Sequence, residues 1–439
     1  MWCRDSGKPS REDDPDVSHR YQQCLPQSSR RVLATPIIPK LELSTSYNSV
    51  IMTSDAPSAL HLPAGDSRCL VYAIDTTCNL TVPADTLVEP VIKGHELMNF
   101  PTVSFLIVHE QSGRKILFDL GCKKDFWDLP PPISSVIDAK VPGIKVDKSL
   151  SDVLEEGGID LNDLEAAIVS HHHYDHMGEP ETFPVQMKLV VGPGFTEQFL
   201  PGYPEVEASP FFSKALQDRV VEEVDFSRSD LIVAGFAAID YFGDGSLYVL
   251  NTPGHALGHL SALARTGTDS FVFLGGDICH FGGSFRPTSR VPLPEELDAT
   301  DILGGEKAHG HAPYRQTTLT ACHPCPGKAT TTPFYQPCSR SDSWYVEPEL
   351  AAQSIQRLQD IDADERVLVI IAHDPSTVDT LTLFPEGPIN EWRGAGLKAK
   401  LRWRFLSELP VEGVEREYLV DGTYMHGRRV KALDGTKIA

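Results

Sequence analysis

Residues 167–178 read Ala-Ile-Val-Ser-His-His-His-Tyr-Asp-His-Met-Gly, so a short apolar run leads directly into four imidazoles and a carboxylate. These side chains are poor core material, because each needs a polar partner when it is buried. In an extended segment His171 and His173 point the same way, since side chains alternate along a strand. A turn after them would bring Asp175 and His176 to a second position beside the first. Imidazole and carboxylate together suit zinc, and also iron or manganese.

Three other apolar runs lead into a histidine or an aspartate. They are 246–250 before His255, 270–274 before Asp277, and 366–371 before His373. Polar ligands delivered from the ends of several strands are how a layered α/β fold builds a rigid site. A surface run of histidines does not fit, because the run at 171–176 follows a buried strand and contains an aspartate.

The rest of the pattern adds elements of the same α/β architecture. Strands are predicted at 70–74, 102–108, 115–118 and 188–191, and helices at 149–156 and 348–360. The dipeptide Ser112-Gly113 supplies a turn between two of these strands, which predicts a β-hairpin. Asn162 is expected to cap the short turn 161–166.

Composition divides the 439 residues into three parts. Residues 1–66 are polar and rich in Ser, Pro and Arg, which predicts a disordered tail. Residues 67–415 are predicted to form one α/β domain, and its Gly-, Pro- and Thr-rich stretch 304–346 is predicted to be a long loop near the mouth of the site. Residues 416–439 form a C-terminal extension.

Net charge and cysteine content indicate which partners and which cellular compartment the protein is expected to have. There are 39 Lys and Arg against 61 Asp and Glu, which gives a net charge of −22. Such a surface repels phosphate, so nucleic-acid binding and a basic membrane-docking face are not expected. No apolar run approaches the roughly 18 residues of a membrane span. Nine cysteines without a regular framework, and an N-terminus without a signal-peptide pattern, predict a cytoplasmic protein.

The pattern His171-x-His173-x-Asp175-His176 resembles the signature of the metallo-β-lactamase superfamily of binuclear metallohydrolases. The later segments follow in that superfamily's order: Thr-Pro-Gly-His at 252–255, Gly-Gly-Asp at 275–277 and Ala-His-Asp at 372–374. Upstream, Phe-Asp-Leu-Gly at 118–121 is similar to the turn that supports the metal loop. The resemblance covers about residues 70–410 and implies a single-domain, four-layer αββα sandwich.

The resemblance also implies a metal site with two ions per chain, Zn²⁺ being expected and Fe or Mn also suitable. One ion would take His171, His173 and His255, the other Asp175, His176 and His373, and Asp277 would bridge both. Two cations about 3.5–4 Å apart bind one hydroxide between them and lower its pKa towards neutrality. The implied chemistry is therefore hydrolysis by a metal-bridged hydroxide, with Asp175 and His280 as the candidate catalytic residues.

Four residues near these motifs have weaker assignments. Lactone-opening members of the superfamily carry a tyrosine three residues after the bridging aspartate, where this chain has His280. That imidazole could donate the same hydrogen bond, act as an acid to the leaving group, or be structural. His172 and His259 are expected to be structural or hydrogen-bonding residues rather than ligands, and Asp119 is expected to hold a ligating imidazole.

The leading functional hypothesis is a zinc-dependent hydrolase of a small lactone, lactam or ester, similar to the acyl-homoserine-lactone lactonase branch in its fungal-type members. The alternative is a thioesterase of the glyoxalase II type, which needs a basic pocket; the basic residues near the end of the domain are Lys398, Lys400, Arg402 and Arg404. A nucleic-acid-processing enzyme is disfavoured by the charge. A redox diiron protein would need a flavodoxin-like module, and a binding module without activity would have lost ligands.

Overall fold

The computed structural model describes residues 60–414 and 416–438, so most of the predicted tail lies outside the described residues. The described part of that tail packs on the domain. Leu60 and Leu62 contact the apolar cluster on the outside of one sheet, and Arg265 donates a hydrogen bond to the carbonyl oxygen of Pro63. The predicted boundary at residue 66 is therefore too late.

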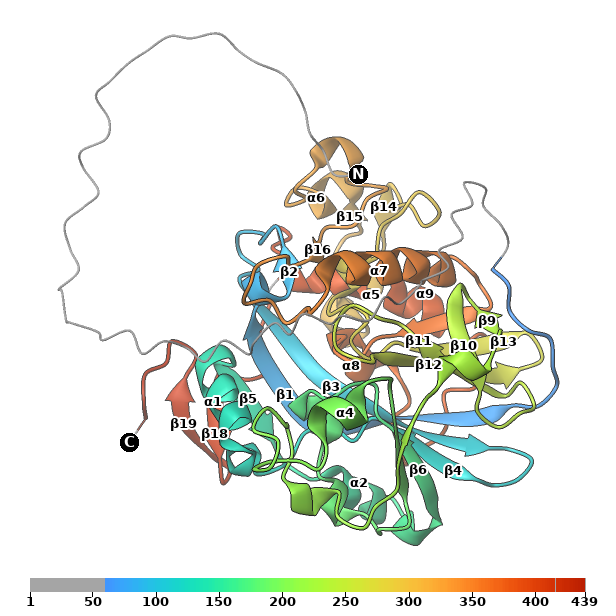
Figure 1. Cartoon of the computed structure of the whole chain (residues 1–439). Coiled ribbons are helices and arrows are strands. Elements are labelled where there is room, and N and C mark those ends of the chain that lie inside the picture. The colour runs from blue at the N-terminus through green and yellow to red at the C-terminus, as the bar shows by residue number, and fades with distance from the viewer. Residues whose placement is uncertain (1–59, 415, 439) are drawn as a thin grey trace. The chain divides into compact units, whose positions relative to one another are not determined.

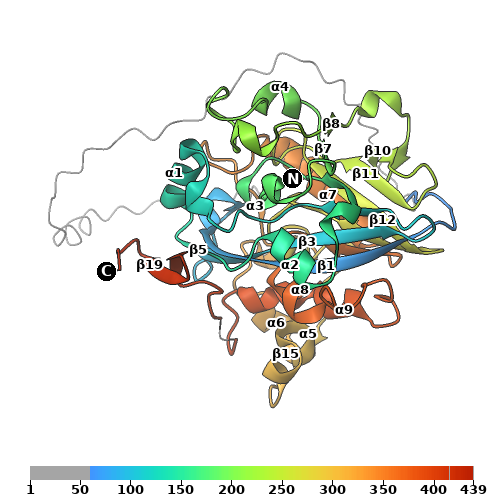
Figure 2. The ribbon, with the colours of Figure 1, turned by 90° about the horizontal axis from the view of Figure 1, so that it is seen from below.

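A nine-stranded sheet forms one half of the domain. Its order is β19 (Arg428–Ala432), β18 (Gly422–Met425), β5 (Gly143–Val146), β1 (Cys69–Pro83), β3 (Leu97–His109), β4 (Lys115–Phe118), β6 (Leu164–Ile168), β7 (Lys188–Val191) and β8 (Val221–Glu223). The long strands β1 and β3 pair in antiparallel fashion and run side by side in both views (Figures 1 and 2). The predicted hairpin of β3 and β4 is confirmed.

A six-stranded sheet forms the other half. Its order is β17 (Val367–Ile370), β13 (Ser270–Leu274), β12 (Leu260–Gly267), β11 (Leu247–Asn251), β10 (Phe236–Asp240) and β9 (Ile232–Val233). The sequence pattern did not reveal β12, because Ser261, Arg265 and Thr266 interrupt its apolar run. All three are buried, and the guanidinium of Arg265 is satisfied by backbone carbonyls.

Apolar side chains of both sheets meet in one cluster, which includes Val71, Phe105 and Ile168 from the large sheet and Ala262 and Leu368 from the small one. Helices cover the outer faces. The buried residues of α2 (Leu150–Glu156) and α4 (Phe195–Phe199) pack on the large sheet, and those of α7 (Pro348–Asp362) on the small one (Figure 1). The predicted four-layer αββα sandwich is thus confirmed.

Helix ends follow the local sequence. Ser149, the first residue of the predicted helix, is instead the cap of α2 and accepts a hydrogen bond from the amide of Asp152. The expected cap at Asn162 is wrong. Asp160 accepts from the amide of Asn162 instead, and β6 begins only two residues later.

The remaining helices and strands are short. They are α1 (Pro131–Lys140), α3 (Tyr174–Met177), α5 (Ala299–Leu303), α6 (Gln316–Leu319), α8 (Pro375–Thr380), α9 (Leu397–Arg402), β2 (Val88–Glu89), β14 (Glu296–Leu297), β15 (Tyr314–Arg315) and β16 (Gln336–Pro337). No helix among the described residues is long and apolar enough to cross a membrane.

The two regions of weak sequence pattern are both built into the domain. The C-terminal extension supplies β18 and β19, and Thr423 of β18 pairs with β5. The 304–346 insert carries α6, β15 and β16 and buries Phe334 and Tyr335. It is therefore a folded insert rather than a bare loop, and β16 pairs with β2.

The loop after β13, which carries Asp277, is anchored to α7 by a buried ion pair. Arg286 donates to Asp362 with an Nε–Oδ2 distance of 2.8 Å, and both side chains are nearly inaccessible to water. A second pair, Arg290 with Asp360, joins the same two elements in a largely exposed position. The two pairs differ mainly in burial, so they form a matched comparison.

Replacing Asp362 by asparagine should lower the free energy of unfolding by about 3–5 kcal/mol, because it leaves a buried guanidinium without its counter-charge. Asp360→Asn should change it by less than about 1 kcal/mol, the usual contribution of an exposed pair. Urea unfolding of both variants measures the difference. Equal effects would show that the buried pair does not anchor the loop.

Candidate metal centre

The histidine-rich segment leaves its strand earlier than the pattern predicts. Strand β6 ends at Ile168, and His171 and His173 lie in the loop that follows, while the helical turn α3 carries Asp175 and His176. Their side chains converge as expected, but a tight loop brings them together rather than strand alternation.

A glycine closes this loop against the neighbouring turn. Gly178 has φ +57°, and a Cβ there would meet the carbonyl oxygen of Leu120 at 2.3 Å. The loop can therefore approach the turn 119–121 only without a side chain at this position.

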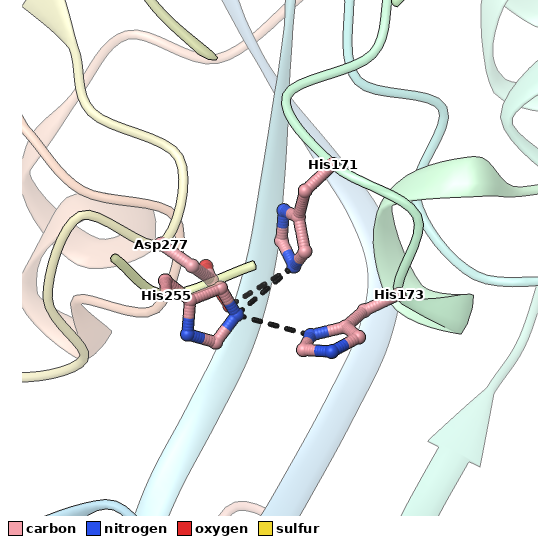
Figure 3. A group of neighbouring side chains, drawn as sticks. All are labelled: His171, His173, His255 and Asp277. Carbon is pink, nitrogen blue, oxygen red and sulfur yellow. Dashed lines mark hydrogen bonds and ion pairs between the residues drawn. The ribbon is translucent and has the colours of Figure 1, made fainter. Parts of the chain in front are cut away.

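The first group of ligand atoms is formed by three imidazoles and one carboxylate oxygen (Figure 3). The Nε2 atom of His255 lies 3.1 Å from Nε2 of His171 and 3.0 Å from Nδ1 of His173. The Oδ2 atom of Asp277 lies 3.4 Å from Nε2 of His255 and 3.7 Å from Nε2 of His171.

The second group faces the other oxygen of the same aspartate. The Oδ1 atom of Asp277 lies 3.1 Å from Nε2 of His373 and 3.3 Å from Nε2 of His176. The Oδ2 atom of Asp175 lies 3.5 Å from Nε2 of His373. Asp277 thus stands between two groups of ligand atoms and turns one oxygen to each, and all seven residues that the sequence singled out as ligands gather here.

Hydrogen bonds on the far side of the rings fix where the protons sit. The Nδ1 atom of His176 donates to Oδ2 of Asp119 at 2.8 Å, and the hydroxyl of Ser170 donates to the same oxygen at 2.9 Å. That hydroxyl can then accept from Nδ1 of His171, which is 3.0 Å away. In their neutral form both rings therefore carry the hydrogen on Nδ1 and turn Nε2 towards the centre, the arrangement that a metal-ligating histidine requires.

His373 is held in the same way by the backbone. Its Nδ1 atom donates to the carbonyl oxygen of Pro101 at 3.0 Å, and its ring stacks on Phe100 with centroids 4.6 Å apart.

The pKa values of the rings differ between the two groups. Burial lowers the pKa of His171, His173 and His255 well below the usual range, so these rings are neutral, as metal ligands must be. Burial also opposes charge on His176 and His373, but the carboxylates, Asp277 foremost, outweigh it and raise the pKa of both rings. The second group therefore attracts positive charge.

The donor set fits a pair of cations. Nε2 of His176 and Oδ1 of Asp277 are buried without a well-directed hydrogen-bond partner among the described residues. Leaving such atoms unpaired costs free energy, and a cation between them would satisfy both. Imidazole nitrogens and carboxylate oxygens are ligands that zinc and other transition metals accept.

The residues with weaker assignments lie where a supporting role is expected. Asp119 contacts His176, as described above. His259 accepts a hydrogen bond at Nε2 from the backbone amide of Asp277 at 3.0 Å, and its Nδ1 lies 3.0 Å from the carbonyl oxygen of Thr252. His172 turns away from the centre and stacks on Phe199.

His280 lies against the first group rather than in it. Its Nε2 atom is 3.3 Å from Oδ2 of Asp277, and its Nδ1 atom is 2.8 Å from the hydroxyl of Tyr345. Burial lowers the pKa of His280, which keeps the ring neutral and disfavours an acid role as imidazolium. The sequence pattern did not point to Tyr345, and the only available signal was the Trp-Tyr pair at the end of the insert.

A pocket opens beside the two groups and encloses about 340 Å³, counting its open mouth. Its polar side consists of His173, Asp175, His255, Asp277, His280 and His373. Its other side is apolar or aromatic and consists of Leu80, Val82, Leu87, Phe100, Val141, Tyr174 and Trp344. No Lys or Arg is among the described residues that line it.

Comparison with known proteins agrees with this geometry. Residues 98–275 match the metallo-β-lactamase superfamily. The chain is 38% identical to the γ-lactamase FDB1 of Fusarium pseudograminearum over 80% of its own length and 85% of that protein. It is 34% identical to the metallo-hydrolase mfmC of Annulohypoxylon moriforme over 81% of its length and 91% of that protein.

A more distant likeness is found among solved structures. An AiiA lactonase mutant from B. thuringiensis, solved with N-decanoyl-L-homoserine at its active site, is 17% identical and covers 74% of this chain and 100% of its own, with a TM-score of 0.47. The family match over residues 98–275 and the two relatives, of which this chain covers 85% and 91%, show that the chain belongs to the metallo-β-lactamase superfamily.

Proposed function

We propose that this hydrolase holds two metal ions, most naturally Zn²⁺, and uses them to open the ring of a small lactam or lactone. The observation that carries the proposal is the carboxylate of Asp277, which presents one oxygen to each of two ligand groups. The names of two relatives support a cyclic amide, since both the Fusarium protein above and MBL2 of Gibberella moniliformis are γ-lactamases. Iron or manganese would suit the same ligands.

The residues divide the work as follows. When bound, a pair of cations lowers the pKa of water and polarises a carbonyl group. Asp175 is both a ligand and a lining residue of the pocket, so its carboxylate can accept a proton beside the ring that opens. The neutral ring of His280 lies opposite and can donate a hydrogen bond to the charge that develops there.

The apolar wall of the pocket supports a small, neutral substrate. Burying a charged group without a partner costs several kcal/mol, and no described lining residue is a lysine or an arginine that could offset that cost. Aromatic side chains such as Phe100 and Trp344 stabilise flat or apolar groups by contact area. A γ-lactam or γ-lactone ring with an apolar substituent meets these conditions.

The thioesterase alternative has less support. Two of the four basic residues near the end of the domain are engaged elsewhere. Lys398 donates to the carbonyl oxygens of Asp364 and Val367, and Arg402 contacts Glu365. None of the four basic residues named for this role lines the pocket.

The purified enzyme should open γ-lactams and γ-lactones with apolar substituents faster than it cleaves a glutathione thioester. Mass spectrometry of each reaction measures the addition of one water molecule. An Asp277→Asn protein purified in the same way controls for contaminating hydrolases. Preference for the thioester would overturn the substrate assignment and favour the alternative.

Metal content should follow the shared position of Asp277. Asp277→Asn should reduce the bound metal at both groups, because it weakens a ligand that they share. Asp175→Asn should reduce only the second group and leave about one equivalent. Elemental analysis of the wild type, expected to give two equivalents per chain, and of both variants distinguishes these cases. Loss of one equivalent in each variant would contradict the bridging role.

His280→Ala should lower turnover by about 10²–10³-fold, the usual effect of removing one donor that faces developing charge. Metal content should stay at the wild-type level, because His280 is outside both ligand groups. Steady-state kinetics and elemental analysis on the same preparation test both points. Wild-type turnover in this variant would reduce His280 to a packing residue.

A further inference from the structure

The end of the 304–346 insert runs directly over the site. We call residues 343–347 the strap. The amide of Trp344 donates to the carbonyl oxygen of Thr86 at 3.0 Å, which fixes one end of the strap. The amide of Val346 donates to the carbonyl oxygen of His255 at 3.0 Å, which ties the other end to the loop of a proposed ligand.

The strap turns Tyr345 inward. The ring of Tyr345 is buried and stands edge-on to His255, with centroids 5.3 Å apart. Its hydroxyl lies 2.8 Å from Nδ1 of His280. A phenolic hydroxyl carries its proton at neutral pH and can donate or accept a hydrogen bond.

The partners of His280 decide which of its nitrogens carries the hydrogen. The carboxylate of Asp277 can only accept, and its Oδ2 lies 3.3 Å from Nε2 of His280. A bare Nε2 would set its lone pair against that oxygen, so Nε2 carries the hydrogen and Nδ1 stays unprotonated. The Tyr345 hydroxyl then donates to Nδ1.

Stacking fixes the plane of the same ring. His280 is nearly parallel to Phe100, with an interplanar angle of 6° and centroids 5.8 Å apart. It is also nearly parallel to His373, at 10° and 6.1 Å. With its plane fixed by stacking, the ring still has two possible tautomers, and only a hydrogen bond in that plane can select one of them.

We propose that Tyr345 is a positioning residue that selects the Nε2–H tautomer of His280 and so aims a neutral hydrogen-bond donor into the pocket. This inference rests on the proposed function, because it assigns the orientation of a residue in that reaction. The ring donates a hydrogen bond to the developing charge and transfers no proton. Deleting the Tyr345 hydroxyl should therefore affect the transition state more than substrate binding.

The insert offers a matched control. Tyr335 is also buried, and its hydroxyl lies 2.6 Å from Nδ1 of another buried histidine, His95. Neither of these residues lines the pocket. Tyr335→Phe thus removes the same kind of bond from the same insert without touching the site.

The first measurement does not depend on turnover. Nitrogen NMR of zinc-loaded, ¹⁵N-histidine-labelled protein distinguishes a bare ring nitrogen from a protonated one, and His280→Gln identifies the signals of His280. We expect Nε2–H with a bare Nδ1 in the wild type and in Tyr335→Phe. In Tyr345→Phe we expect a mixture of tautomers. An Nδ1–H wild type, or an unchanged tautomer in Tyr345→Phe, would overturn the proposal.

The second measurement is kinetic. Tyr345→Phe should lower kcat about tenfold, as expected for one lost hydrogen bond, with KM within about twofold and full metal content. Tyr335→Phe should retain wild-type kcat. A change in KM alone would overturn the positioning role. If the wild-type protein hydrolyses no lactam or lactone, the proposed function fails, while the NMR result still decides whether Tyr345 sets the tautomer.

Discussion

The carboxylate of Asp277 is the constraint on which the rest of the site depends. Five imidazoles approach its two oxygens within 3.1–3.7 Å. Four of them belong to the ligand groups, and the fifth is His280, which lies beside these groups. A buried carboxylate is unfavourable unless positive charge compensates it. The sandwich therefore has to hold these groups rigidly enough for bound cations to supply that positive charge.

Rigidity comes from hydrogen bonds behind the rings. Asp119, Ser170 and the carbonyl of Pro101 satisfy the outward-facing nitrogens of three rings, those of His171, His176 and His373, which turn their Nε2 atoms to the centre. Asp119 itself adopts φ 62°, an uncommon conformation for a residue with a side chain, and such strain is tolerated where the surrounding contacts hold it in place. The hydrogen bonds that hold the ligating rings in place are thus as specific as the set of ligands itself.

The folded insert completes what the sandwich leaves open. It contributes Trp344 to the wall of the pocket and Tyr345 to the hydrogen bond with His280. The superfamily fold provides the paired ligand groups, while an added segment shapes the space above them. The shape of the pocket therefore depends in part on a region with no strong sequence pattern.

By itself the sequence indicated the hairpin and the strands that end in histidine or aspartate, and its resemblance to the superfamily implied the sandwich and the seven residues that gather at the centre. Tertiary structure alone decided the path of the insert, the buried strand β12 and the partners of His280. Arg265 made β12 look polar in the sequence. Its guanidinium can nevertheless be buried, because carbonyl oxygens from distant segments accept its hydrogen bonds. Tyr345 lies 65 residues from His280 along the chain, and only the folded strap brings its hydroxyl within hydrogen-bond distance.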